Sequence, residues 1–499
     1  MDRTHEKKLR LVDYLVVASM LFGLFFGAGN LIFPLHLGQL AGKNWAIAGA
    51  GFLITGVVLP LLSVLAIAVT RSKGVYDIGR PLGPAFAIVF MVLIHATIGP
   101  FFGTPRTATV SFTVGIEPFI PSSYRTAALL IFSALFFIFA FLLSYKENSI
   151  LSNIGKVLNP LFLILLFIVF FMAFISPLGS SFGKSPQDAH YISGAFTNGL
   201  LEGYNTMDVL AGLAFGVTVV TTIRLMGVRH EKNVASVTAK SGTIAMFAVA
   251  VIYILLIAMG SMSLGRFTMS SNGGIVFSQI VQAYAGKAGQ ALLAALIVVT
   301  CLTTAVGLVA AFAQDFHNHF PKVSYHTWLA LCCILSFIIA NFGLDTIIAW
   351  STPVLMLLYP FAMVLILLSV CSPLFKRDRA VYGWVVGFTA IPALMDMVVS
   401  FPDTVSKSSF ALFIARVRDL LPLADYGLSW LLPAVAGAVI GLAVHLYKLK
   451  AKPEAFKEYD SFIEESNQTW PGNLAADGSQ PAADFDSDTD SSAAEQVTA

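Results

Sequence analysis

Residues 23–34, which read GLFFGAGNLIFP, interrupt the first long apolar segment of the chain. Three glycines, an asparagine and a proline stand where the flanking residues 11–20 and 35–42 would otherwise form one helix long enough to cross a bilayer. Glycine weakens a helix interior, and proline also removes a backbone donor. The sequence therefore predicts a membrane helix that is broken near its middle.

A broken membrane helix can bind a ligand. Backbone groups freed at membrane depth must face protein or a cavity. Two half-helices that meet offer N–H groups to an anion and carbonyl groups to a cation, which is how many secondary transporters bind substrate and coupling ion. The alternative is that the small residues only allow close helix packing. Packing alone does not explain Asn30 and Pro34, so a binding break is favoured.

The composition indicates a membrane protein. Of 499 residues, 57% are hydrophobic and 12% are charged, and the mean hydropathy is +0.79. A soluble globular protein does not need so much apolar surface, whereas a membrane-spanning helix needs about 20 mostly apolar residues. The sequence predicts an all-α polytopic membrane protein with twelve transmembrane helices. They are expected at 12–41, 45–70, 82–114, 125–145, 152–176, 196–223, 238–265, 286–314, 326–344, 346–371, 380–400 and 427–447.

The loops predict the orientation and the connections. Most of the 30 Lys and Arg residues fall on the inner side if the N-terminus is cytoplasmic, so the positive-inside rule places both termini in the cytoplasm. Residues 1–11 are a cytoplasmic leader. Residues 453–499 are acidic, with the run DFDSDTDSS, and are expected to be a disordered cytoplasmic tail. The longer outer connections are expected at 177–195, 266–285 and 401–426.

A second interruption lies in the sixth segment, which reads FTNGLLEGYNTMDVLAGLAFG over residues 196–216. A glycine and four polar residues crowd its middle: Glu202, Gly203, Asn205, Thr206 and Asp208. A central Asp alone costs roughly 2.5 to 3.5 kcal/mol on insertion scales. The sixth segment enters from the opposite side to the first, so the two matching breaks are typical of an inverted-topology repeat with a site at the midplane.

The eighth segment carries a face of threonines. Thr300, Thr303 and Thr304 stand at i, i+3 and i+4 and share one side of a helix. Their oxygens would suit a small alkali cation if other oxygens converge opposite. Alternatively, each hydroxyl bonds the carbonyl four residues earlier, as threonine commonly does in apolar helices. Spacing alone favours this alternative.

Ionisable residues also lie inside the third and eleventh predicted membrane segments. Arg106 in the third segment is either functional or reaches the outer interface by snorkelling. His95 is favoured as a satisfied interior histidine over a proton relay. Asp396 in the eleventh segment has no partner that the sequence identifies.

Three motifs together carry a family resemblance: FFGAGNLIFP at 25–34, GPFFGTPRTATVSF at 99–112 and GYNTMDVLAGLAFG at 203–216. The chain resembles the bacterial branched-chain amino acid carriers, the leucine/isoleucine/valine:cation symporters, over essentially all twelve segments. The resemblance implies the leucine-transporter fold, a five-plus-five inverted repeat with broken helices 1 and 6. The first repeat would be 12–176, the second 196–371, and two extra helices would occupy 380–447.

The resemblance also implies the binding residues. A sodium site between helices one and eight would use the carbonyls of Gly23, Phe26 and Thr300 and the hydroxyls of Thr303 and Thr304. With the resemblance included, a cation site at these threonines is favoured over hydroxyls that only bond their own helix. The substrate carboxylate would meet N–H groups around Gly27 and Gly29, with Asn30 bracing the break. The substrate ammonium would meet carbonyls of the second interruption, at Gly203, Tyr204, Asn205 and Thr206.

The expected function is secondary active import of leucine, isoleucine and valine across a bacterial cell membrane, coupled to sodium by alternating access. We expect no cofactor beyond the coupling ion, no nucleic-acid partner and no enzymatic activity, and the sequence has no Walker motif for ATP. One alternative is a proton-coupled carrier for these or other neutral amino acids, with His95 or Asp208 titrating. Another is a non-coupled channel, which the clustering of polar residues at two breaks disfavours.

Overall fold

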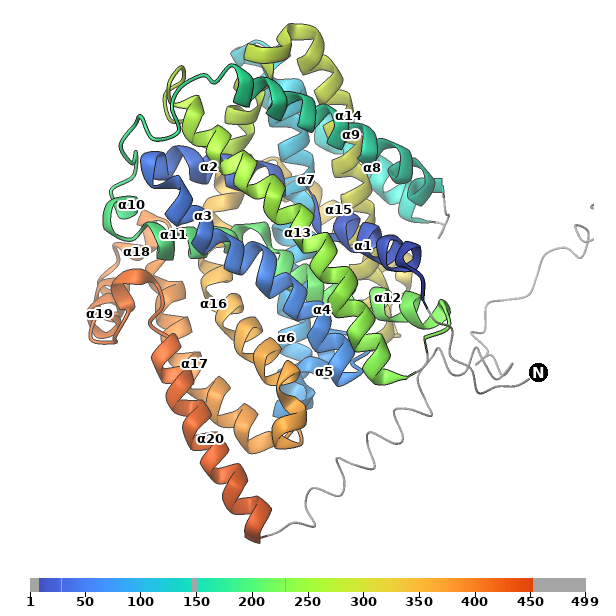
Figure 1. Cartoon of the computed structure of the whole chain (residues 1–499), viewed down its shortest axis with the longest axis vertical. Helices are drawn as coiled ribbons and strands as arrows, with labels where there is room; N and C mark the ends of the chain where they lie inside the picture. Colours follow the sequence, from blue (N-terminus) through green and yellow to red (C-terminus); the bar gives the residue numbers. More distant parts are fainter. Residues whose placement is uncertain (1–8, 28, 146–149, 229, 452–499) are drawn as a thin grey trace, which may run out of the picture.

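A computed structural model describes residues 9–27, 29–145, 150–228 and 230–451 (Figure 1). Within these ranges the chain forms helices, turns and loops, and no β-strand. The first half holds α1 (Leu11–Phe25), α2 (Gly29–Ala41), α3 (Trp45–Leu53), α4 (Leu59–Thr70), α5 (Val75–Gly79), α6 (Pro84–Ala96), α7 (Gly103–Ser111), α8 (Arg125–Tyr145), α9 (Ile150–Ile175) and α10 (His190–Ser193). The second half holds α11 (Ala195–Glu202), α12 (Asp208–Leu225), α13 (Glu231–Ser263), α14 (Gly273–His319), α15 (Tyr325–Ala340), α16 (Leu344–Val370), α17 (Arg379–Val399), α18 (Asp403–Ser406), α19 (Ser409–Arg418) and α20 (Leu431–Ala451).

Most of the predicted leader and the whole predicted acidic tail lie outside the described residues. Within them, nine helices are long and apolar enough to cross a membrane, and one of these runs from α2 through α4. Three shorter helices are also apolar, namely α1, Leu163–Ile175 of α9, and α15. The chain is thus an all-helical protein with several membrane-spanning helices, and the number of twelve crossings stays a prediction.

Both predicted interruptions are confirmed. The first break separates α1, which ends at Phe25, from α2, which begins at Gly29. The second break separates α11 from α12 and consists of a 3-10 turn over Gly203–Thr206 followed by Met207. Each break falls at the glycine and polar residues that the sequence singles out.

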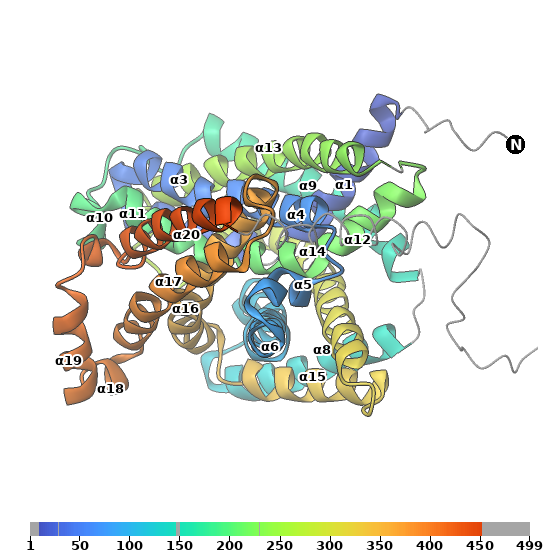
Figure 2. The same ribbon diagram turned by 90° about the horizontal axis from the view of Figure 1, so that it is seen from below.

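Helices of the two halves interleave. The pairs in contact are α2 with α13, α3 with α11, α4 with α12, α7 with α14, and α8 with α15. In Figure 1, α3 and α4 run beside α13, and Figure 2 shows α13 and α15 on opposite sides of the molecule. Both breaks therefore lie among helices that come from both halves.

The contact between α3 and α11 depends on two glycines. A Cβ on Gly199 would lie 1.9 Å from the carbonyl oxygen of Ala48, and a Cβ on Gly51 would lie 1.9 Å from that of Phe196. No side chain fits at such distances, so the two backbones touch directly. This contact fixes the half-helix that leads into the second break.

The predicted outer connection at 266–285 contains helix over most of its length. Helix α14 begins at Gly273, because the side chain of Asn272 accepts hydrogen bonds from the N–H groups of Gly274 and Ile275 at 3.0 and 3.2 Å. A kink at Gly286, with φ 61°, separates this early part from the predicted eighth segment. The connections at 177–195 and 401–426 also contain short helices, α10, α18 and α19.

Helices α17 and α20 pack side by side (Figure 2), and Asp378 joins them at one end. Its carboxylate accepts from the Ala380 N–H and from Nδ1 of His445, both at 2.9 Å, and from Lys448 Nζ at 3.4 Å. Burial opposes the charge on Asp378, but these three donors outweigh it and lower its pKa below the ordinary value. The cluster caps α17 and holds α20 against it.

Candidate functional site

The side chain of Asn30 stabilises the first break. Phe26 has an extended backbone, with φ −79° and ψ 94°, which ends α1. In a continuous helix the Gly27 N–H would donate to the Gly23 carbonyl, but here it donates to Asn30 Oδ1 at 3.0 Å. The break therefore withdraws this donor from the Gly23 carbonyl, one of the predicted sodium ligands.

Asn30 also joins the two breaks to each other. Its Nδ2 donates to Asp208 Oδ2 at 2.7 Å and to the hydroxyl of Tyr253, which in turn donates to Asp208 Oδ2 at 3.0 Å. All three side chains are buried. Hydrogen bonds in such a low-dielectric interior are strong and are costly to break. This network ties α2 to α12 and α13.

The second break has an unusual backbone. Met207 adopts a left-handed conformation, with φ 61° and ψ 11°, and ends the 3-10 turn. The Thr206 hydroxyl donates to the Gly203 carbonyl at 2.9 Å and accepts from the Asp208 N–H at 3.3 Å. A Cβ on Gly203 would lie 2.0 Å from Thr55 Oγ1, so α11 can enter the turn only with glycine there. The residues of the break itself therefore determine its backbone conformation.

Arg106 on α7 reaches the second break. It is only 3% exposed. Nη1 donates to the Asn205 carbonyl at 2.5 Å, and Nη2 donates to Ser351 Oγ on α16 at 3.1 Å. Its Cζ lies 4.8 Å from the centre of the Phe33 ring on α2. The guanidinium points into the protein, so the snorkelling alternative is wrong.

An apolar wall flanks the second break. The buried rings of Tyr204 and Tyr359, the latter on α16, stack with centroids 4.2 Å apart and planes 16° from parallel. On the polar side, Nδ2 of Asn205 donates to Glu202 Oε2 at 3.2 Å. Carbonyl groups, a carboxyl group and aromatic surface therefore meet around one turn.

The two breaks and the threonine face lie close together. A Cβ on Gly29 would lie 3.4 Å from the Phe33 ring and 3.8 Å from the Thr206 carbonyl oxygen. A Cβ on Gly27 would lie 3.5 Å from Thr304 Cγ2 and 3.8 Å from Thr304 Oγ1. These are ordinary contact distances, so close helix packing does not require either glycine. The N-terminal end of α2 thus lies beside carbonyl groups of the second break and beside α14.

The threonine face makes hydrogen bonds within its own helix. The hydroxyls of Thr303 and Thr304 donate to the Thr300 carbonyl at 2.7 and 3.1 Å. A hydroxyl that donates keeps lone pairs free to coordinate a cation. The Thr300 hydroxyl is buried with no hydrogen-bond partner among the described residues. The Thr304 bond is the one that the alternative predicts, and the Thr300 carbonyl accepts both hydroxyls. Sodium coordination by this face stays a prediction.

A cavity of about 330 Å³ reaches the second break. Its lining includes polar side chains of Glu202, Asn205 and Thr352 and apolar side chains of Leu355 and Met356. Phe33 and Tyr204 also line it. The cavity offers polar groups at the break and an aliphatic wall on α16, which suits a small ligand with a charged end and an apolar end.

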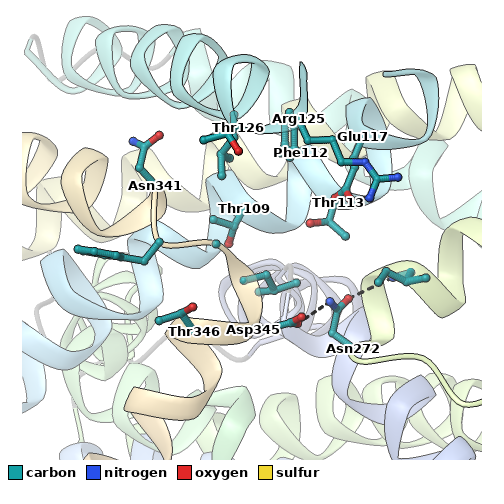
Figure 3. Close-up of a pocket in the computed structure, with 15 residues that line it drawn as sticks. Thr109, Phe112, Thr113, Glu117, Arg125, Thr126, Asn272, Asn341, Asp345 and Thr346 are labelled. Atoms are coloured by element: carbon teal, nitrogen blue, oxygen red, sulfur yellow. Dashed lines mark hydrogen bonds and ion pairs between the residues drawn. The ribbon is translucent and has the colours of Figure 1, made fainter. Parts of the chain in front are cut away.

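A second pocket, of about 380 Å³, shares Asn272 with this cavity (Figure 3). It holds an ion pair between Arg125 and Glu117 at 3.2 Å, and Asn272 Nδ2 donates to Asp345 Oδ1 at 2.7 Å. None of the predicted substrate or sodium residues lines it. The cavity at the second break is therefore the better candidate for the functional site.

The sequence matches a known family along most of its length. The family model described as "Branched-chain amino acid transport protein" matches residues 10–448. The chain belongs to this family. A member of it is a transport protein and not an enzyme, as the names of its relatives also show.

Several curated relatives of this branched-chain amino acid transport protein cover nearly all of both chains. The branched-chain amino acid permease BrnQ of Lactobacillus delbrueckii subsp. lactis is 41% identical over 89% of this chain and 100% of its own length. BrnQ of Bacillus subtilis is 37% identical over 89% of this chain and 99% of its own. BrnQ of Escherichia coli K12 is 35% identical over 88% and 96%.

Solved structures share the fold of this branched-chain amino acid transport protein. Mhp1, a nucleobase-cation-symport-1 family transporter, aligns with a TM-score of 0.54 and 12% identity over 90% of this chain and 96% of its own. MhsT, solved in complex with L-phenylalanine, aligns with a TM-score of 0.53 and 15% identity over 89% and 99%. At such low identity the likeness concerns the fold alone, which is the leucine-transporter fold.

Sequence reasoning missed the partners of the ionisable residues in this branched-chain amino acid transport protein. Asp208 was recognised as out of place in an apolar segment, but its partners Asn30 and Tyr253 lie on other helices. Arg106 was recognised in the same way, and Ser351 on α16 gave no signal. A charged residue in a membrane segment predicts that a partner exists without naming it.

His95 and Asp396 also have partners elsewhere in the chain. Nε2 of His95 pairs with Asp315 Oδ2 on α14 at 2.7 Å, and His95 is buried. Asp396 accepts a hydrogen bond of 2.6 Å from the Ser429 hydroxyl, and Arg418 lies 3.9 Å from its other oxygen. Neither residue is part of the two breaks, but Asp396 interacts electrostatically with Tyr204 of the second break.

Proposed function

We propose that this chain is a secondary active symporter that imports leucine, isoleucine and valine through a bacterial cell membrane, with sodium as the coupling ion. The family and the relatives named as branched-chain amino acid permeases support the substrate class. The fold shared with a cation-symport family transporter and with a protein solved with an amino acid supports coupled transport.

The observation that carries the proposal is the meeting of the two helix breaks. Gly29 at the start of α2 lies beside the Thr206 carbonyl of the second break, and Gly27 lies beside Thr304. An N-terminal helix end attracts an anion, and free carbonyls attract a cation. A zwitterionic amino acid needs both, a helix N-terminus for its carboxylate and carbonyls for its ammonium, and a small cation needs carbonyls.

In the proposed substrate site the carboxylate meets N–H groups around Gly27 and Gly29, braced by Asn30. The ammonium meets carbonyls of the second break, at Gly203, Tyr204, Asn205 and Thr206. The branched side chain extends toward the apolar wall of the 330 Å³ cavity, which includes Leu355 and Met356. Selectivity for aliphatic side chains then follows from the size and polarity of this wall.

In the proposed sodium site the ion joins α1 to α14. Its ligands are the carbonyls of Gly23, Phe26 and Thr300 and the hydroxyls of Thr303 and Thr304. The withdrawal of the Gly27 N–H from the Gly23 carbonyl supports this assignment, because it leaves that oxygen open to a cation. Sodium bound there would hold the first break against the eighth segment and so organise the substrate site.

Transport would follow by alternating access. Helices one, two, six and seven would rock against the remainder and expose the site first outward and then inward. The contacts that pair α2 with α13 and α4 with α12 support one moving group built from both halves of a five-plus-five repeat. In this proposal the chain crosses the membrane twelve times and both termini are cytoplasmic.

One observation favours a proton as the coupling ion instead. His95 and Asp315 form a buried contact of 2.7 Å between α6 and α14, and histidine changes its charge near neutral pH. In this second candidate the pair would take up and release a proton during each cycle. Its mark would be leucine uptake that needs a pH gradient and no sodium.

Uptake of leucine into proteoliposomes tests both versions. One set of vesicles receives an inward sodium gradient, and an identical set receives a choline gradient at the same pH. Accumulation above equilibration with sodium alone is the expected result. Equal uptake in both sets removes sodium from the mechanism, and the same vesicles under a pH gradient then test proton coupling.

A further inference from the structure

Arg106 puts a positive charge inside the protein, and no described carboxylate bonds to it directly. An arginine guanidinium stays charged in proteins. The side chain is 3% exposed, and no carboxylate of the described residues forms an ion pair with it. A buried charge in a membrane protein is expensive and is normally paired. Glu202 interacts with the guanidinium electrostatically, with Asn205 between them. Arg106 therefore has room for an anion bound directly to its guanidinium, which no described carboxylate provides.

The groups that contact the guanidinium directly are neutral. They are the Asn205 carbonyl, the Ser351 hydroxyl and the face of the Phe33 ring. Nε of Arg106 is buried with no hydrogen-bond partner among the described residues. A guanidinium presents five N–H donors in a fixed fork, which matches the two oxygens of a carboxylate. Part of this fork is thus still available.

Arg106 lies beside the place where an amino acid would bind. Its Nη1 bonds the second break, and Phe33 contacts both the guanidinium and the position of a Cβ on Gly29. In a zwitterionic amino acid the carboxylate and the ammonium are attached to the same carbon. A ligand whose ammonium lies at the second break therefore has its carboxylate close to Arg106.

We infer that Arg106 binds the carboxylate of the transported amino acid and that the bound carboxylate neutralises the buried charge. The inference rests on the proposed function and adds a side chain to a site otherwise built from backbone groups. It also gives a reason for selectivity between an amino acid and its uncharged amide. The amide keeps the ammonium and the aliphatic side chain but brings no charge to Arg106.

Ligand binding to the purified full-length protein tests this assignment with L-leucine and L-leucinamide as probes. The wild type is expected to bind leucine more tightly than leucinamide. Arg106→Gln should weaken leucine binding by about 10- to 100-fold, as for loss of a hydrogen bond between charged groups. The same variant should bind leucinamide as the wild type does, so the preference for leucine disappears.

Two further variants serve as comparisons. Arg106→Lys keeps the charge without the fork and should retain part of the preference, which keeps the test informative if Arg106→Gln does not fold. Arg125→Gln removes an exposed arginine of the pocket in Figure 3 and should keep the full preference.

Two outcomes would overturn the assignment. One is an unchanged preference for leucine in both Arg106 variants. The other is tighter leucine binding by Arg106→Gln, which would mean that Arg106 competes with the substrate ammonium for the Asn205 carbonyl. A wild type that binds neither probe would instead contradict the proposed function, so the two failures are distinguishable.

Discussion

Asn30 serves both breaks with one amide side chain. Its oxygen accepts the Gly27 N–H, and its nitrogen donates to Asp208 and Tyr253. Each bond satisfies a buried polar group that has lost its helical partner or cannot reach water. Leaving such a group unsatisfied costs about 1 to 3 kcal/mol. A single side chain therefore stabilises the geometry of the whole binding region.

Replacing this amide is expected to abolish transport without preventing membrane insertion. Asn30→Ala leaves the Gly27 N–H and Asp208 without their partner, and leucine uptake should fall at least about tenfold. Uptake by proteoliposomes that contain equal amounts of protein measures the effect. Asn44→Ala is the control, because the Asn44 amide donates to the Tyr191 carbonyl, which belongs to neither break. Uptake by Asn30→Ala within a factor of two of the wild type would contradict the prediction.

The threonine face makes a prediction about sodium. The double variant Thr303→Ala, Thr304→Ala removes two of five predicted oxygen ligands, so the sodium concentration for half-maximal leucine uptake should rise about tenfold or more. Thr389→Ala is a matched control, since its buried hydroxyl also bonds a carbonyl of its own helix, that of Val385, at 2.7 Å. An unchanged sodium dependence in the double variant would remove Thr303 and Thr304 from the site.

Single residues show where prediction from sequence succeeds and where it stops. Glycine, asparagine and proline at 23–34 act on their own backbone, so the sequence alone locates the break. The bond from Arg106 to Ser351 joins residues 245 positions apart. Nothing local to either residue encodes that contact, because it depends on how the helices pack. Positions of breaks were therefore predictable, and the partners of buried charges were not.

Among the helices, α3 and α11 meet through backbone at Gly51 and Gly199. Such contact is available only to glycine, and it sets the angle at which α11 enters the second break. The same holds in part for the first break, but there Gly27 and Gly29 have room for a Cβ. Glycines therefore have two roles: at α11 they allow two helix backbones to touch, and at the start of α2 they leave the backbone N–H groups uncovered by side chains of their own.

The packing role predicts a loss of stability from one added methyl group. Gly199→Ala would place Cβ 1.9 Å from the Ala48 carbonyl oxygen and force α3 and α11 apart. Overpacking of this kind costs about 1 to 3 kcal/mol, so the melting temperature in detergent should fall by about 2 to 6 °C.

Gly387→Ala on α17 is the control for this effect, because nothing lies within 4 Å of its added Cβ. Alanine is the better helix former there, so that variant should be at least as stable as the wild type. Equal melting temperatures for both variants would show that α3 and α11 can separate without cost.

Helix α14 shows a limit of prediction at the level of elements. Hydropathy predicts its apolar part from 286 onward, and the less continuously apolar stretch before Gly286 is predicted as a connection without its helix. The start of this stretch did carry a local signal, the capping side chain of Asn272. A search for membrane spans weighs hydrophobicity and overlooks caps.

In the whole molecule, contacts between halves follow a regular pattern. The pair α3 and α11 joins segment two to segment six, and the pair α2 and α13 joins segment one to segment seven. A two-fold relation between the halves would exchange these two pairs. The inverted repeat stays a prediction, and this exchange supports it.

Alternating access predicts that ligands close the cavity at the second break. Thr352 lines this cavity, so Thr352→Cys should react with a membrane-impermeant thiol reagent. Sodium and leucine together should slow the reaction at least about fivefold, because they favour the closed state. The background needs Cys371→Ser, since Cys371 is exposed.

Leu374→Cys provides the comparison in this experiment, because Leu374 is exposed and lies outside the cavity. Its labelling should not respond to sodium or leucine. Protection at both positions would indicate a general change in reagent access, and protection at neither would contradict closure of this cavity.

The left-handed backbone of Met207 stores free energy at the second break. A residue with a Cβ costs about 1 to 2 kcal/mol in this conformation, and glycine avoids most of that cost. Met207→Gly should therefore favour the described arrangement, which distances between spin labels on α11 and α12 would measure as a shift in populations. An unchanged distribution of these distances would show that Met207 keeps its left-handed conformation in every populated state.

Backbone strain that is present in only one conformational state affects the rate at which the transporter leaves that state. If Met207 has an ordinary backbone conformation in another state, that state is stabilised by about 1.4 kcal/mol relative to the described one, which changes their relative occupancy roughly tenfold. The carrier would then leave the described state readily after each turnover. In that case a methionine at this position would limit how long the protein rests between substrates.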